Sequence, residues 1–439
     1  RQMLRWPLED FVKNAKYWVV FPMAYYLDNP LPPAPAESYT SRGVPSSTGA
    51  SLLYSGAVLR ILKSRLQTVT LRNTRLWFGW LQGVKRGAAV VPESFVEEAY
   101  IKHRKILSTP PVTDDRHLLR ATMYFDRYYA RFSPSAITEL KEASTSAAWS
   151  APRSLGGARE YIREAILSGQ RPVADDRAFE KSRLPHTKQL VAMYEEAPAV
   201  VHRVKGDPVS VKLSDNLPLL RQDIGGQPGL HTYVPGKGPT PVRVQAVLEP
   251  LKVRLITKGE PFTYWLARQP QKELWEYNFR LPQFVLTGTP LREEFLYDLQ
   301  ERTRRLGLLP TFRKICSGDF SAATDRLNLH YTMSAFLASM ARLPHGDEVV
   351  SYLRNVIGRQ HLFYPKPKGM DESEYRAKLG PVMQENGQLM GSVLSFPYLC
   401  VINLTMYWMT LEQYLGRRIP IRALPVLVNG DDILFFTDD

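Results

Sequence analysis

The chain has 439 residues, of which 44% are apolar, so it can build a large hydrophobic core and is too apolar to be a disordered protein. Lysine and arginine number 57 against 43 acidic residues, and the net charge of +14 predicts a polyanionic partner such as nucleic acid. The two cysteines, Cys316 and Cys400, exclude a disulfide framework or a cysteine-based zinc site and favour a reducing compartment.

The first half of the chain has a helical pattern that is broken by loops. Residues 1–27 carry an aromatic run on a helical pattern, and residues 28–50 are rich in Pro and Ser, which predicts a loop or linker. Residues 51–205 alternate basic amphipathic helical segments with short breaks, and residues 206–242 have the Gly and Pro content of a loop.

From about Arg243 the pattern changes to short apolar runs with strand character, namely RVQAVLEP, KVRLIT, FVLTG and RKICSGDF. Strand alternation in the second run places Lys252, Arg254 and Lys258 on one face. A row of cations that faces one way suits a triphosphate, and the arginine can stack on a base. An exposed strand face with solvated charges is the alternative.

Residues 314–331, KICSGDFSAATDRLNLHY, predict a strand followed by a helix. Asp319 falls at the end of the strand, and Asp325 falls in the first turn of the helix. Carboxylates that only complement the positive end of the helix dipole are the alternative for both residues.

Residues 384–403, QENGQLMGSVLSFPYLCVIN, predict a glycine-rich loop and then an apolar helix that packs under the sheet. Gly387 and Gly391 would let the backbone approach a ribose or a template closely, whereas the alternative is a simple glycine-rich helix start. The uncharged stretch at 386–411 has the length of a membrane span. Its Asn, Gln, Ser, Thr, Gly and Pro favour a buried core helix, so we expect no membrane span.

Residues 424–436, LPVLVNGDDILFF, predict a hairpin with both strands buried, because Asn429 and Gly430 tolerate positive φ between two apolar runs. Asp431 and Asp432 then lie at a tight turn, where two like charges repel unless a cation lies between them. An ordinary Asp-rich turn is the alternative.

Together, the strand end and the hairpin predict a metal site. If the two strands are neighbours, Asp319, Asp431 and Asp432 can hold two divalent cations about 3.5–4 Å apart. Mg²⁺ is the expected ion because it prefers carboxylate and phosphate oxygens, and Mn²⁺ is the alternative ion.

The segments GDFSAATD, NGQLMGSVLSFP and VNGDD, in that order, resemble motifs A, B and C of a viral RNA-dependent RNA polymerase, and KVRLITKG resembles motif F. The resemblance is to the botourmiavirus (ourmia-like) group, which is allied to narnaviruses and mitoviruses. It extends over residues 250–436, and GVPSSTGASLLYS at 43–55 carries a weaker likeness.

This resemblance implies an α/β (α+β) fold of the right-hand polymerase type, with an antiparallel-sheet palm and mostly helical fingers. It implies an enzyme that copies an RNA template into RNA from nucleoside triphosphates by two-metal nucleotidyl transfer. Asp319 and Asp431 would be metal ligands with Asp432 as an auxiliary ligand, and Asp325, assisted by Ser395, would recognise the ribose hydroxyl.

The resemblance also implies which residues bind substrate. Lys252, Arg254 and Lys258 would contact the incoming triphosphate and base, and Gly391 belongs to the loop that approaches the ribose. Many such polymerases carry an Asn four residues after the position of Ser395, where this sequence has Leu399. Asn403, one helical turn later, is the remaining candidate for sugar selection.

The motifs divide the chain into consecutive parts. These are an N-terminal segment and linker (1–45), an N-terminal extension with helical fingers (46–242), fingers with motif F (243–310), palm motif A (311–333), a fingers or palm insertion (334–383), and palm motifs B and C (384–439).

The sequence starts without Met and stops soon after the hairpin, so we expect both ends to have been cut from a longer polypeptide. A thumb would come from a C-terminal continuation or a second protein, and the isolated chain is not expected to support processive synthesis. The outer edge of the hairpin would be an exposed apolar strand. We expect the host cytoplasm as the location, with the mitochondrion as the alternative.

Three other functions fit part of the pattern. A reverse transcriptase shares the paired-Asp hairpin, but Gly430 and Asp325 argue against it. A basic RNA-binding structural protein would share the charge without needing the carboxylates. A membrane-anchored replication accessory protein would depend on residues 386–411.

Overall fold

The computed structural model describes residues 8–28, 70–86, 91–137, 143–149, 151–169, 239–249, 252–345 and 347–438, together with positions 30, 31, 60, 61, 64, 140 and 212. Most of the predicted linker at 28–50, the whole segment at 43–55 and most of the predicted loop at 206–242 lie outside the described residues.

The chain divides into two compact units. The smaller comprises Arg1–Val96 and Val247–Arg254, and the larger comprises Glu97–Ala246 and Leu255–Asp439. The division crosses β2, so Lys252 and Arg254 belong to the smaller unit and Lys258 to the larger.

The smaller unit contains two helices that pack on each other, α1 (Leu8–Tyr26) and α3 (Leu71–Arg86). Buried Phe11, Val12 and Ala15 recur at helical spacing on α1, which confirms the predicted helix over Leu8–Tyr26, whereas residues 1–7 lie outside the described residues.

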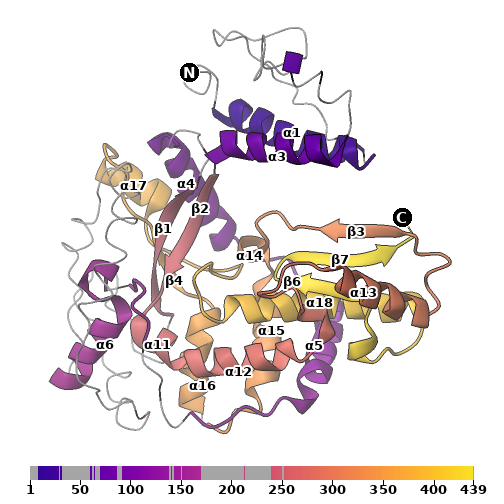
Figure 1. Ribbon diagram of the computed structural model, residues 1–439. Helices are drawn as coiled ribbons and strands as arrows, with labels where there is room; N and C mark the ends of the chain where they lie inside the picture. The colour runs from indigo at the N-terminus through magenta and orange to yellow at the C-terminus, as the bar shows by residue number, and fades with distance from the viewer. Residues whose placement is uncertain are drawn as a thin grey trace. The chain divides into compact units, whose positions relative to one another are not determined.

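Most of the helices belong to the larger unit (Figure 1). They are α4 (Glu93–Ser108, whose first residues lie in the smaller unit), α5 (Asp115–Tyr128), α6 (Gly157–Ser168), α11 (Pro261–Leu266), α12 (Arg268–Phe279), α13 (Glu293–Arg305), α14 (Ala323–Arg326), α15 (Leu329–Met340), α16 (Asp347–Ile357), α17 (Glu372–Leu379) and α18 (Ser395–Leu415). Short 3₁₀ turns are η1 (Tyr129–Arg131), η2 (Arg153–Leu155), η3 (Pro282–Phe284) and η4 (Ile421–Ala423).

One sheet has the order β2-β1-β4-β5. Its strands are β1 (Pro241–Glu249), β2 (Lys252–Lys258), β4 (His361–Phe363) and β5 (Val382–Met383). Strand β4 runs parallel to β1 and antiparallel to β5.

A second sheet is antiparallel throughout and has the order β3-β7-β6. Its strands are β3 (Lys314–Gly318), β6 (Val426–Asn429) and β7 (Asp432–Thr437). The predicted strand before Asp319 and the predicted hairpin are therefore confirmed, and the two are neighbours. Strand β6 is buried as expected, but β7 is only half-buried, so the prediction of two fully buried strands is wrong for β7.

Helix α18 runs along the sheet beside β6 and also packs against α5, α12 and α15 (Figure 1). Its apolar residues Tyr398, Val401 and Leu404 are fully buried in the main core. The uncharged stretch at 386–411 is thus a core helix entered through a loop, as predicted. Of the helices that the structure describes, none combines the length and apolar character that crossing a membrane requires.

The strand predicted for FVLTG is wrong. These residues form the end of η3 and a turn, in which the Thr287 amide donates to the Phe284 carbonyl and Gly288 has a φ of 78°. An apolar run next to such a turn residue satisfies its backbone locally instead of joining a sheet. The mixed α/β class is confirmed, whereas the right-hand layout and the domain boundaries stay predictions.

Candidate active site

The pairing of β3 with β7 brings the carboxylates of motifs A and C to the same edge of the sheet. Gly318 pairs with Ile433, so the next residue, Asp319, follows opposite Asp432. Burial raises the pKa of Asp432, and the charges of Asp431 and Asp319 raise it further. These three residues are named here the carboxylate cluster, and within it the charges of Asp431 and Asp319 each repel that of Asp432.

A two-residue turn carries Asp431 and leads directly into Asp432. Asn429 pairs with Asp432, so the turn consists of Gly430 and Asp431. The expectation of Asn429 and Gly430 as the turn is wrong by one residue, because only Gly430 has a positive φ, at 69°. A glycine at the first turn position is typical of tight hairpins. A Cβ there would also lie 3.0 Å from the Phe396 ring on α18.

Helix α18 holds the turn from below. The Asn403 amide donates to the carbonyl of Gly430 at 3.0 Å and approaches that of Asp431 at 3.4 Å, and the Gly430 amide donates to the Cys400 sulfur at 3.3 Å. Burial raises the pKa of the Cys400 thiol to about 12, so no thiolate forms beside the carboxylates. Sequence reasoning missed Cys400, although positions 400 and 403 share one helix face.

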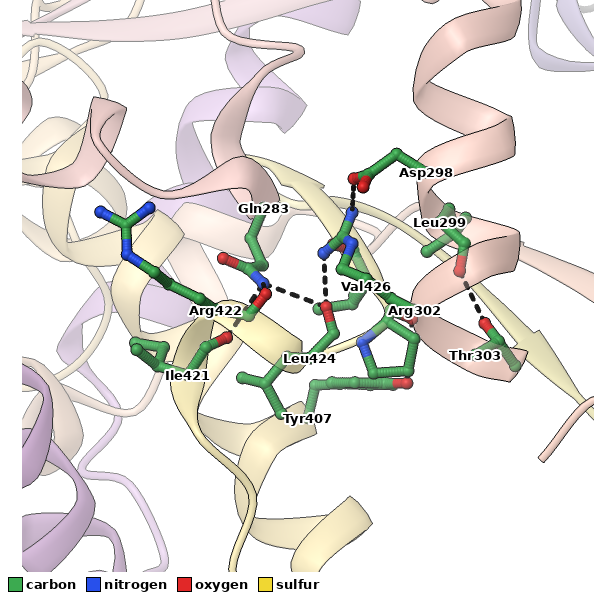
Figure 2. Close-up of polar contacts among 11 residues, drawn as sticks. Gln283, Asp298, Leu299, Arg302, Thr303, Tyr407, Ile421, Arg422, Leu424 and Val426 are labelled. Atoms are coloured by element: carbon green, nitrogen blue, oxygen red, sulfur yellow. Dashed lines mark hydrogen bonds and ion pairs between the residues drawn. The ribbon is translucent and has the colours of Figure 1, made fainter. Parts of the chain in front are cut away.

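The outer edge of the hairpin is covered, which corrects the expectation of an exposed apolar strand. In an antiparallel hairpin alternate carbonyls point away from the partner strand. The carbonyls of Leu424 and Val426 accept from the Arg302 guanidinium of α13 at 2.5 Å and 3.4 Å, and Gln283 donates to Leu424 at 3.0 Å. Figure 2 shows these side chains on the segment that leads into β6, with Asp298 paired to Arg302 at 2.9 Å.

Asp325 lies on α14, where the sequence predicted a helix start, and the loop of motif B holds that helix. The backbone amide of Gln388 donates to the Thr324 carbonyl at 2.7 Å, and the backbone amide of Gly387 donates to the Leu327 carbonyl at 3.0 Å. A Cβ on Gly387 would overlap the Asp325 carbonyl, so glycine is required there. Burial raises the pKa of the Asp325 carboxyl to about 6.

The hydroxyl groups of the motif B loop hold its backbone. The Ser395 hydroxyl donates to the Leu389 carbonyl at 2.9 Å, and the Ser392 hydroxyl donates to the Val356 carbonyl at 2.7 Å. The role predicted for Ser395 in ribose recognition stays a prediction, as does that of Asn403, whose amide here binds the turn.

The larger unit brings Lys258 of motif F and Gly391 of motif B to one cavity of about 170 Å³. A backbone hydrogen bond joins the two motifs, since the Thr257 amide donates to the Met390 carbonyl at 2.7 Å. A Cβ on Gly391 would overlap Thr257. Burial lowers the pKa of Lys258 to about 8, with a smaller contribution from Arg243, so the amine is still mostly protonated at neutral pH.

The other two motif F cations lie in the smaller unit. Arg254 pairs with Glu249 at 2.6 Å, and both side chains are exposed. Contacts of Lys252 and Arg254 with a nucleotide stay predictions.

The carboxylate cluster has the oxygen donors that Mg²⁺ or Mn²⁺ prefers, and its mutual repulsion would be relieved by a cation. The residues fit a divalent ion by chemistry. Across the part of the chain that the structure describes, no three acidic, His or Cys side chains converge at ligand spacing.

Comparison with known proteins adds one relative, because no protein-family model matches the chain. The chain is 27% identical over 445 residues to the RNA-dependent RNA polymerase of Ourmia melon virus (isolate Melon/Iran/VE9). The aligned region covers 98% of this chain and 47% of that polymerase, so the chain spans about half the length of its relative. The resemblance predicted from the four motifs is confirmed: the chain is similar to a viral RNA-dependent RNA polymerase of the ourmia-like group.

Proposed function

We propose that the chain carries the catalytic centre of a viral RNA-directed RNA polymerase that copies an RNA template from nucleoside triphosphates. The pairing of β3 with β7 carries this proposal, because it brings Asp319 and Asp432 to one edge of the sheet. The similarity to an ourmia-like polymerase over nearly the whole chain supports it, and so does the net charge of +14.

In this proposal the carboxylate cluster holds the divalent cations. Asp319 and Asp431 are the main ligands and Asp432 is auxiliary. Bound cations would neutralise the triphosphate and favour attack by the primer hydroxyl. The chain itself mainly supplies position, as in other phosphoryl-transfer enzymes. Asn403 and Cys400 hold the turn that carries Asp431 and precedes Asp432.

The nucleotide would contact both remaining motifs. Lys258, protonated at neutral pH and beside Gly391 in the same cavity, would bind the triphosphate as a cation. Asp325 would accept a hydrogen bond from the ribose 2′-hydroxyl. A site that pairs with a hydroxyl discriminates well against a substrate lacking it, so RNA precursors are preferred over DNA precursors.

Asp319→Asn and Asp431→Asn in the complete enzyme test the catalytic assignment. Each removes one negative charge from the carboxylate cluster with little change in shape. We expect primer extension with Mg²⁺ or Mn²⁺ to fall on the order of a thousandfold or more, the scale seen when charge neutralisation is lost in phosphoryl transfer. RNA affinity, measured by filter binding, should stay nearly unchanged.

Asp126→Asn is the matched control, because Asp126 is an exposed carboxylate on α5 and belongs to none of these motifs. It should retain wild-type extension. Normal synthesis by either cluster variant would end the proposed assignment. Extension with deoxynucleotides on the same template, in preference to ribonucleotides, would instead indicate a reverse transcriptase.

A further inference from the structure

A buried histidine outside all the polymerase motifs faces Asp325. His103 lies on α4, and its side chain is only 3% exposed. Its Nδ1 lies 2.8 Å from the hydroxyl of Tyr364, and its Nε2 lies 3.8 Å from Oδ1 of Asp325. The Nε2 atom is buried and makes no hydrogen bond within the described structure. A buried polar atom without a partner is costly, so its orientation needs an explanation.

The tautomer of His103 follows from its two neighbours. Burial raises the pKa of Tyr364, so this hydroxyl keeps its proton and can donate to Nδ1. Burial lowers the pKa of His103 to about 4, so the ring is neutral at pH 7. The single ring hydrogen then sits on Nε2 and faces Asp325. The other tautomer would aim a lone pair at a carboxylate, which is repulsive.

The position of His103 is fixed by the backbone around it. The Leu107 carbonyl, one turn further along α4, accepts from the amides of Glu385 and Asn386 at 2.7 Å and 3.0 Å. Arg104 donates to the Gly380 carbonyl at 3.0 Å. Helix α4 is therefore bound to the start of motif B, whose next residues hold α14 and Asp325.

The separation of 3.8 Å is longer than a hydrogen bond, but it places the ring nitrogen and the carboxylate oxygen next to each other. Asp325 is 22% exposed, so one part of its carboxylate faces His103 while another stays accessible. The other charged groups nearby are Arg326 beside Asp325 and Arg104 beside Tyr364. A donor aimed at the carboxylate favours its ionised form, which is the form that accepts from a hydroxyl.

We propose that His103 and Tyr364 form a positioning pair that orients and keeps ionised the carboxylate of Asp325, and so strengthens the choice of ribonucleotides over deoxyribonucleotides. This inference rests on the proposed function, and in particular on the contact of Asp325 with the ribose.

Single-nucleotide incorporation by the complete enzyme tests the pair, with kcat/KM measured for ATP and for dATP. His103→Leu removes the donor, and we expect kcat/KM for ATP to fall about tenfold, the effect of one hydrogen bond. The value for dATP should change little, because dATP has no 2′-hydroxyl. A general structural defect would lower both values together.

Two further variants separate positioning from packing. Tyr364→Phe keeps the ring and removes only the hydroxyl that selects the tautomer, so it should lower the ATP preference in the same direction. His103→Gln places an amide donor close to the position of Nε2 and should restore part of the preference. The ATP preference of His103→Leu should also be lost at a higher pH than in the wild type, since Asp325 protonates more easily without the donor.

His117→Leu is the matched control, since it breaks a His–Tyr contact of 2.6 Å on an exposed part of α5. It should leave the ATP/dATP ratio unchanged. If Asp325→Ala lowers the ratio but His103→Leu and Tyr364→Phe do not, the positioning pair is refuted while the proposed function stands. If Asp325→Ala has no effect on the ratio, both the ribose contact and the pair are refuted.

Discussion

Burial moves the pKa values of Asp325 and His103 in opposite directions. The pKa of Asp325 rises from 3.8 to about 6, and that of His103 falls from 6.5 to about 4. Between about pH 4 and about pH 6 the folded chain keeps a proton on Asp325 that the unfolded chain has lost. It also lacks a proton on His103 that the unfolded chain has gained. The first effect lowers stability as pH rises and the second raises it, so together they nearly cancel.

His103→Leu should expose the contribution of Asp325 alone. Only the extra proton on folded Asp325 then remains, so the free energy of unfolding should fall as pH rises from about 4 to about 6. The slope of the unfolding free energy against pH should be more negative than that of the wild type, by up to about 1.4 kcal/mol per pH unit, the value for one proton. Urea unfolding at a series of pH values measures it. Stability curves of variant and wild type that stay parallel across this range would contradict the expectation.

At the scale of elements, an ion pair between half-buried Arg127 and buried Glu412 joins α5 to α18. Arg127 donates to both oxygens of Glu412 at 2.9 Å, and its guanidinium stacks against the rings of Tyr124 and Trp408. Glu412 also accepts from Tyr124 and from the Ile419 amide. Burial raises the pKa of Glu412, but these hydrogen bonds outweigh it and lower the pKa to about 2. The pair therefore stabilises the fold above about pH 4.5, and that contribution is lost as pH falls toward 2.

Arg127→Met should destabilise the protein by about 3 kcal/mol at pH 7, because it leaves the Glu412 carboxylate buried without its cation. The deficit should shrink toward acid pH, where Glu412 can protonate. Chemical unfolding at both pH values measures the effect. Arg120→Met is the control, since Arg120 is exposed on the same helix and donates to the neutral Gln413 side chain. If both variants lost the same free energy of unfolding, the ion pair between Arg127 and Glu412 would add nothing to stability.

At the scale of the molecule, the net charge of +14 is the property that bears on the proposed binding of RNA. Phosphate contacts by Lys and Arg release counterions, so binding depends on salt far more than on base sequence.

RNA affinity should fall steeply as salt rises, with a log–log slope of several units, and should vary little between unrelated single-stranded sequences. Fluorescence anisotropy with two labelled RNAs across a salt series measures both properties. A nearly flat salt dependence, or a strong preference for one sequence, would argue against a charged template channel.

The sequence by itself determined the elements that carry the motifs. The alternation of Lys252–Lys258 predicted β2, the apolar runs around Asn429 predicted the hairpin, and the uncharged stretch before residue 411 predicted a buried helix. These succeed because periodicity and turn chemistry act between residues a few positions apart. The run FVLTG failed because the same local composition also suits a turn, and only a neighbouring strand would have decided otherwise.

Only the tertiary structure decided what surrounds the predicted carboxylates. Cys400 below the turn, Arg302 on the edge of β6, and His103 facing Asp325 each act across many intervening residues. Such contacts leave no periodic pattern in the sequence, because a buried His or Arg looks like any other until its partner is known. Whether a group is charged also depends on burial, which moves the pKa of Asp325 to about 6, and burial is a property of the packed chain.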